Sequence, residues 1–134
     1  MNARTIFLAM ALAGSASAQE VDMPAGRDLF MTYCWQCHGP DASGNGPMAE
    51  ILAIPTPDLT RLASNNHGVL DVEAMARQID GRDALPAHGG EMPVFGPFFD
   101  TGTMAVFQLP SGQRLMTSVQ IASVIVYLES LQRE

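Results

Sequence analysis

The 134-residue sequence contains no lysine, and its seven basic residues, all arginine, face fourteen acidic residues. The formal net charge at neutral pH is −7. A chain this acidic is not attracted to the phosphates of nucleic acids or to an anionic membrane surface. The composition therefore predicts no nucleic-acid partner, and it leaves the fold open.

Long apolar runs are also lacking. The run at residues 6–13, "IFLAMALA", is far shorter than the roughly 20 apolar residues of a membrane-spanning helix. Arg4 stands before it, and Ala16 and Ala18 occupy the small-residue positions of an A-x-A cleavage site. We therefore expect residues 1–18 to be a secretory signal peptide. The mature chain, residues 19–134, is then one periplasmic domain without membrane insertion.

Cysteine is scarce, and the two that occur, Cys34 and Cys37, are only three positions apart. Exported proteins commonly pair cysteines as disulfides, but a bridge across so short a loop constrains the unfolded chain very little. The pair is therefore interpreted as a chemical site. Together with His38 it forms C-x-x-C-H, the signature of covalent c-type haem attachment.

The spacing suits that chemistry, because residues three apart on a helical turn present their side chains on the same side. Each of Cys34 and Cys37 forms a thioether with one haem vinyl group. His38 then reaches the iron through Nε2, while Nδ1–H donates to a backbone carbonyl and fixes the ring.

Two other uses of the motif were weighed. A thioredoxin-like dithiol requires a βαβ context, which the sequence does not display. A zinc site requires four ligands, and only His67 and His88 could complete the set, without metal-ligand spacing. We expect His67 to be an exposed loop residue, whereas His88 is a second, less favoured candidate for axial ligation of haem iron.

Hydrophobic periodicity and capping residues predict a small all-α domain with long loops. Its first and last helices are expected to pack together, and a short hairpin is expected near residues 104–116, about a Pro-Ser-Gly turn. Residues 83–102 read as irregular. The first three expected helices are 25–33, 48–52 and 72–79, and Asp71 caps the third. The last helix is expected to begin with a capping box of Thr117 and Gln120 and to turn Ser123 and Ser130 away from the core. Its expected buried face consists of Ile121, Val124, Ile125, Leu128 and Leu131.

The chain resembles the class I (monohaem) cytochromes c of soluble bacterial type. The resemblance is carried by "GRDLFMTYCWQCHG" at 26–39, "GNGP" at 44–47, "PDLTRLA", "EMPVFG" and "VIVYLESL" at 124–131. It implies the small cytochrome c fold, in which Gly26 and Phe30 meet the last helix near Tyr127. It also implies that the Pro47 carbonyl accepts the hydrogen bond from His38.

The resemblance further implies a methionine as the second axial ligand of the iron. Met92 in "GGEMPVFG" matches the family's Met-Pro motif. Residues 93–116 separate it from the last helix, so Met104 and Met116 stay open as alternatives. For the haem propionates, Arg61 is the favoured partner, and Arg77 and Arg82 are further candidates.

These features predict a periplasmic single-electron carrier with one covalent haem c, His38 and Met92 as axial ligands, and no enzymatic activity. The expected partners are a redox donor and acceptor met transiently by a monomer, through a basic or apolar surface of the partner. Two alternatives stay open. One is a haem protein with an open distal site for gas binding or peroxide chemistry. The other is an electron-transfer subunit of a larger redox complex, with residues 96–116 as its docking surface.

Overall fold

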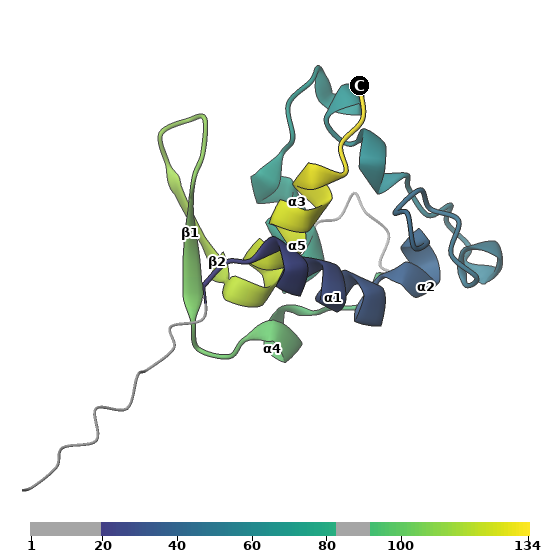
Figure 1. Cartoon of the computed structure of the whole chain (residues 1–134), viewed down its shortest axis with the longest axis horizontal. Coiled ribbons are helices and arrows are strands. Elements are labelled where there is room, and N and C mark those ends of the chain that lie inside the picture. The colour runs from purple at the N-terminus through teal and green to yellow at the C-terminus, as the bar shows by residue number, and fades with distance from the viewer. Residues whose placement is uncertain (1–19, 83–91) are drawn as a thin grey trace, which may run out of the picture.

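The computed structural model describes residues 20–82 and 92–134, which form short helices and one β-hairpin (Figure 1). The expected signal peptide and His88 lie outside the described residues. In chain order the elements are α1 (Met23–Tyr33), α2 (Trp35–His38), the 3₁₀ helices η1 (Ala49–Ile51), η2 (Leu59–Arg61) and η3 (Ser64–Asn66), α3 (Val72–Asp80), α4 (Gly96–Phe99), β1 (Met104–Gln108), β2 (Arg114–Ser118) and α5 (Val119–Ser130).

Helix α1 crosses α5 closely, and this contact is the centre of the fold (Figure 1). A Cβ atom on Gly26 would overlap the backbone carbonyl of Ser123, so only glycine allows the two backbones to approach this far. One turn later, Phe30 is fully buried, and its ring centroid lies 5.5 Å from that of Tyr127. The predicted packing of the first and last helices is confirmed.

Helix α5 is buried on nearly every side rather than along one face. Besides α1, both α3 and α4 contact it. Ser123 is only 1% exposed, and its hydroxyl accepts a hydrogen bond of 3.1 Å from the Asp22 amide. The prediction that Ser123 faces away from the core is therefore wrong, because the start of α1, at Asp22 and Gly26, covers that side. Ser130 is exposed, as predicted.

The N-cap of α5 is Ser118, whose side chain accepts from the Ile121 amide at 3.2 Å. The predicted capping box of Thr117 and Gln120 is wrong, because Ser118 takes the cap and Thr117 lies one residue before it, opposite Ala105 in the hairpin. Gln120 instead donates to the Thr101 hydroxyl at 2.9 Å.

Helix α3 matches its prediction closely. The Asp71 side chain accepts from the Ala74 amide at 2.9 Å, and Gly81 ends the helix in the left-handed conformation. The face bearing Met75, Ala76 and Ile79 is buried in the core that α5 shares.

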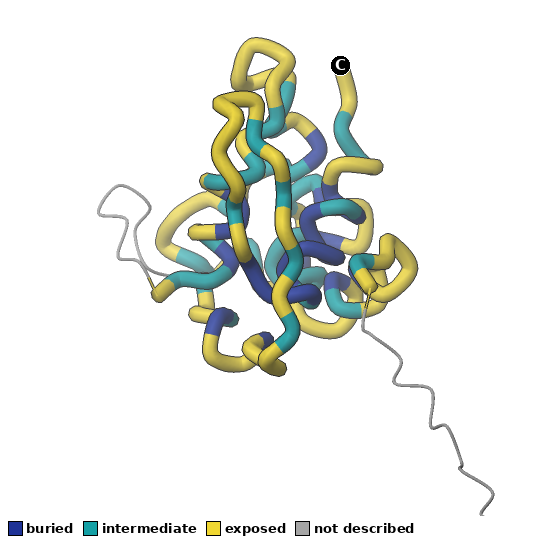
Figure 2. Tube along the Cα trace, turned by 90° about the vertical axis from the view of Figure 1, so that its left-hand side faces the viewer, coloured by how far each residue is buried: buried dark blue, intermediate teal, exposed yellow. Residues whose placement is uncertain are grey.

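The hairpin is antiparallel, with Val106 opposite Met116. Exposed and half-buried residues alternate along β1, so one face of the ribbon turns toward solvent; Figure 2 shows the burial of the described residues. The hairpin confirms the prediction for 104–116, while α4 lies in a stretch that was expected to be irregular. The fold is thus nearly all-α with one small hairpin.

Among the residues that the structure describes, no helix has the length and apolar character needed to cross a membrane.

Candidate haem site

The C-x-x-C-H residues occupy the joint between α1 and α2. The Cys34 amide still donates to Phe30 O of α1, at 2.9 Å. The Cys34 carbonyl in turn accepts from the amides of Cys37 and His38, at 3.2 and 3.0 Å. Cys34, Cys37 and His38 therefore share one helical turn, as the spacing predicted. No disulfide joins Cys34 to Cys37.

Burial, and after it the proximity of Cys37, raises the pKa of the Cys34 thiol to about 11. Cys34 is therefore a protonated thiol at neutral pH. A thioredoxin-like nucleophile needs the opposite shift, because the thiolate is the reactive form. This environment speaks against a redox dithiol.

The loop that follows the motif folds back over it through a ladder of backbone hydrogen bonds. The amides of Gly44, Gly46 and Met48 donate to the carbonyls of His38, Cys37 and Gln36, at 2.8, 3.1 and 2.8 Å. At Gly46 an added Cβ would meet the carbonyl groups of Gln36 and Cys37. Helix α2, which carries Cys37 and His38, is thus held in place by a loop that requires glycine at position 46.

The imidazole of His38 is half-buried, and its Nδ1 is fully enclosed without a hydrogen-bond partner among the described residues. Desolvation lowers the pKa of His38, and the backbone carbonyl of Pro57 partly offsets that shift. His38 is therefore a neutral imidazole, the form that coordinates metals.

The carbonyl expected beside this imidazole was that of Pro47. The structure gives Nδ1 no hydrogen bond to Pro47, and the carbonyl that acts on the ring belongs to Pro57 instead. The reason is the path of the loop: the chain at Gly44 runs against the carbonyls of Thr56 and Pro57, which brings this later segment next to His38. Pro57 is a site residue that the sequence reasoning missed, although it begins the "PDLT" segment that the resemblance singled out.

Met92 is half-buried and packs against the hydrophobic core. Its sulfur lies 3.7 Å from Nε2 of Gln78 on α3, and this amide donates a hydrogen bond to it. The other two candidates, Met104 and Met116, lie on the hairpin with 47% and 62% of their surface exposed. A ligand of haem iron must be sheltered from water, so the surroundings of these three methionines favour Met92.

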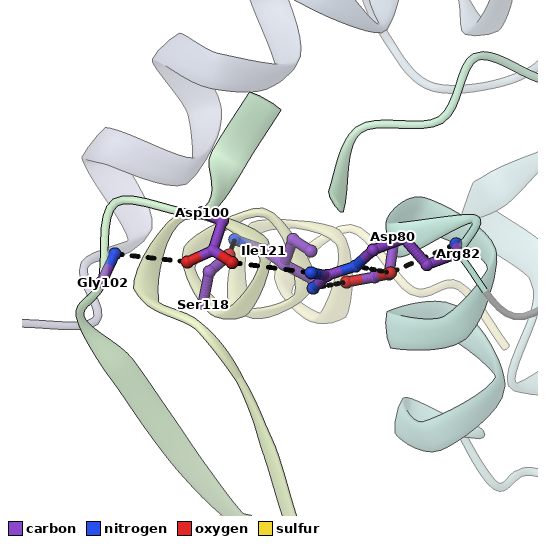
Figure 3. A network of polar contacts seen from close by, with 6 residues as sticks. All are labelled: Asp80, Arg82, Asp100, Gly102, Ser118 and Ile121. Atoms are coloured by element: carbon purple, nitrogen blue, oxygen red, sulfur yellow. Dashed lines mark hydrogen bonds and ion pairs between the residues drawn. The ribbon is translucent and has the colours of Figure 1, made fainter. Parts of the chain in front are cut away.

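The candidate arginines have different surroundings. Arg77 forms an exposed ion pair with Glu73 at 2.8 Å. Arg82 is held by Asp80 at 2.7 Å and by Asp100 at 3.5 Å, as Figure 3 shows. Arg61 is exposed at the end of η2, so its role toward a propionate stays a prediction. His67 is exposed in a left-handed turn, as expected for a loop residue.

The donors present fit a haem. Two neighbouring thiols precede a neutral imidazole, and a sheltered thioether lies on a later segment. The buried, unpaired Nδ1 of His38 faces the Pro57 carbonyl, which is the arrangement that orients an imidazole ligand. Half-buried apolar residues at the margin of the core offer surface for an apolar macrocycle, and they include Trp35, Leu59, Leu62, Leu70 and Val72.

Comparison with protein families agrees with this site. The family model for cytochrome c matches residues 24–132, and the chain belongs to that family. Membership implies a covalently attached haem c with its iron, and a role in haem-based electron transfer. The searches of curated proteins and of solved structures gave no match.

Proposed function

We propose that the protein is an exported single-electron carrier with one haem c, held by thioethers to Cys34 and Cys37 and ligated axially by His38 and Met92. Two observations support the proposal: the neutral, half-buried imidazole of the C-x-x-C-H turn, and the sheltered methionine sulfur on the segment that follows α3. A haem held by these residues would supply one-electron transfer at its iron.

His38 and Met92 have separate tasks in this proposal. Burial keeps His38 neutral, so that Nε2 binds the iron while the Pro57 carbonyl faces Nδ1. The Met92 sulfur would complete the ligation of the iron, which would exclude exogenous ligands and favour the ferrous state. Arg61 is the proposed counter-charge for a propionate, because both Arg77 and Arg82 are engaged with carboxylates.

The proposed setting follows from the sequence. Export by a cleaved signal peptide at residues 1–18 supplies the periplasmic location in which this monomer meets its redox donor and acceptor. The chain has no lysine, so a partner surface that is basic, or apolar around the haem edge, complements it better than an acidic one.

The test is the Met92→Ala variant of the exported protein. The weak near-red absorption band of ferric iron–thioether ligation is expected to disappear, and the ferrous form is expected to bind carbon monoxide rapidly and completely. The wild-type protein should show the band and resist carbon monoxide. Met116→Ala serves as the matched control, since it removes an exposed methionine from the hairpin and should leave the spectrum unchanged.

A band that survives in Met92→Ala but vanishes in Met116→Ala or Met104→Ala would assign the ligand elsewhere. Rapid carbon monoxide binding by the wild-type protein would instead establish an open distal site and a different function.

A further inference from the structure

The amide of Gln78 is the one group, in the part of the chain that the structure describes, with a hydrogen bond to the sulfur of Met92. The Nε2–Sδ distance is 3.7 Å, and the contact is partly buried. Thioether sulfur is a weak acceptor, and an unbranched methionine has three rotatable bonds. A fixed donor at this sulfur therefore restricts a side chain that would otherwise be free to turn.

The donor itself is held firmly by α3. Gln78 lies one turn after Met75 and directly before Ile79, both of them buried in the core. The helix is capped at its start by Asp71 and ended by the left-handed Gly81. The side chain of Gln78 thus projects from an element whose position is set by the core.

The methionine is tied to the same turn of α3 through its own backbone segment. The Phe95 amide donates to Ile79 O at 3.1 Å, and a Cβ atom added at Gly81 would contact Val94. One residue further, Gly96 packs against Asp80, where a Cβ would collide with the carboxylate and the backbone carbonyl. The end of α3 therefore contacts the segment that begins at Met92 at four consecutive residues, Gln78, Ile79, Asp80 and Gly81.

We propose that Gln78 is a positioning residue for the distal ligand: its amide N–H donates to the Met92 sulfur and holds that sulfur on the iron. A thioether has two lone pairs, so one can bind the iron while the other accepts from Gln78. The inference rests on the proposed function, since it requires Met92 to be the ligand. The sequence offered no signal for it, because Gln78 is a polar residue on an amphipathic helix like any other.

The experiment compares Gln78→Leu with the wild-type holoprotein, using imidazole as a competing ligand for the ferric iron. Leucine keeps the helix and much of the volume but cannot donate. The ferric affinity for imidazole is expected to rise roughly two- to tenfold, the factor that corresponds to the net contribution of one hydrogen bond. The near-red band is expected to shift, because it reports the donor strength of the bound sulfur.

Two further variants make the result specific. Gln78→Glu keeps the shape of the side chain but presents a carboxylate without a donor at neutral pH, so it should resemble Gln78→Leu in imidazole affinity and in the band. Gln113→Leu makes the same change at an exposed position of the hairpin turn and should match the wild type. Thermal unfolding of each holoprotein measures general destabilisation separately from the ligand exchange.

The outcomes distinguish the two proposals. If Met92→Ala abolishes the near-red band while Gln78→Leu leaves both the band and the imidazole affinity unchanged, the role of Gln78 is overturned and the ligation by Met92 stands. If the affinity rises only in step with a lowered unfolding temperature and the band keeps its position, Gln78 has a general structural role and the inference is wrong. If the band does not depend on Met92 at all, both proposals fail.

Discussion

Gly46 lies where the loop after the haem motif crosses back over α2. Its amide donates to Cys37 O at 3.1 Å, and a Cβ atom there would meet backbone atoms of Gln36 and Cys37. Backbone atoms cannot move aside as the end of a flexible side chain can. A single missing methyl group at this position therefore decides how closely the loop holds Cys37 and His38.

We expect Gly46→Ala to destabilise the holoprotein by about 1–3 kcal/mol, the usual cost of overpacking, and to lower the fraction of exported protein that carries haem. The measurements are the free energy of unfolding in denaturant and the haem-to-protein ratio.

Gly112→Ala is the matched control for Gly46→Ala. Position 112 is left-handed with φ of +83° and has no atom within reach of a new Cβ, so this variant costs only backbone strain, about 1–2 kcal/mol. It should keep its full haem content. Equal haem loss in both variants would show that crowding against the motif is not the cause.

Some residues of the site could be predicted from the sequence and others could not. C-x-x-C-H fixes its own local geometry, so Cys34, Cys37 and His38 were predictable from their spacing. The carbonyl that acts on the His38 ring was not predictable, because its position depends on how a loop returns through space. Pro47 and Pro57 both follow the motif in Gly- and Pro-rich loops, and only the packing of Gly44 against Pro57 distinguishes them.

At the scale of elements, the helices with local signals were predicted well. Asp71 and Gly81 mark the ends of α3 in the sequence, and the structure uses both. The start of α5 was misplaced by one residue, because Thr117 and Ser118 are both residue types that cap helices and they stand side by side in the sequence. Ser123 was misjudged for a similar reason: a helix covered on several sides has no polar face to reveal by periodicity.

The close crossing of α1 and α5 predicts that replacing Gly26 by alanine lowers the stability of the protein, whereas such a change in a helix usually raises it. Replacing a helix-interior glycine by alanine ordinarily stabilises a helix by about 1 kcal/mol. In Gly26→Ala the new Cβ would overlap the Ser123 carbonyl, so we expect a loss of stability of about 1–3 kcal/mol instead. Denaturant unfolding of the holoprotein measures it.

The ordinary alanine–glycine difference in α1 can be measured at Met31, which is 37% exposed, by comparing Met31→Ala with Met31→Gly. Alanine should be the more stable of that pair. If alanine is also the more stable residue at position 26, the two helices are not in the close contact described above.

At the scale of the whole molecule, the C-terminus ties the loops of the site to the core. The Gln132 side chain accepts from the Ala63 amide at 3.0 Å and donates to Leu59 O at 2.8 Å. The Arg133 amide donates to Thr60 O, also at 2.8 Å. The segment around η2 is therefore fastened to the end of α5, although the two are far apart in the sequence.

Within that segment, Asp58 accepts from the amide and the hydroxyl of Thr60, at 2.9 and 2.6 Å. These hydrogen bonds lower the pKa of Asp58, and the same kind of interaction lowers the pKa of Asp41, through Ser43, and of Asp80, through Arg82. A carboxyl whose pKa is lower in the folded state stabilises the fold above its unfolded pKa, near 3.9, and this contribution is lost as the pH falls through the folded value.

We therefore expect the free energy of unfolding to be steady above about pH 5 and to fall as the pH drops below about 4. The free energy of unfolding of the Asp58→Asn variant should fall less steeply over this acid range. An asparagine oxygen can still accept from Thr60 and keep the cap of η2, but it takes up no proton, so the variant removes one titrating group while the fold is preserved. Denaturant unfolding at a series of pH values, for both proteins at the same salt concentration, measures the two slopes. If the curves of unfolding free energy against pH are parallel for Asp58→Asn and the wild type, protonation of Asp58 does not contribute to the loss of stability in acid.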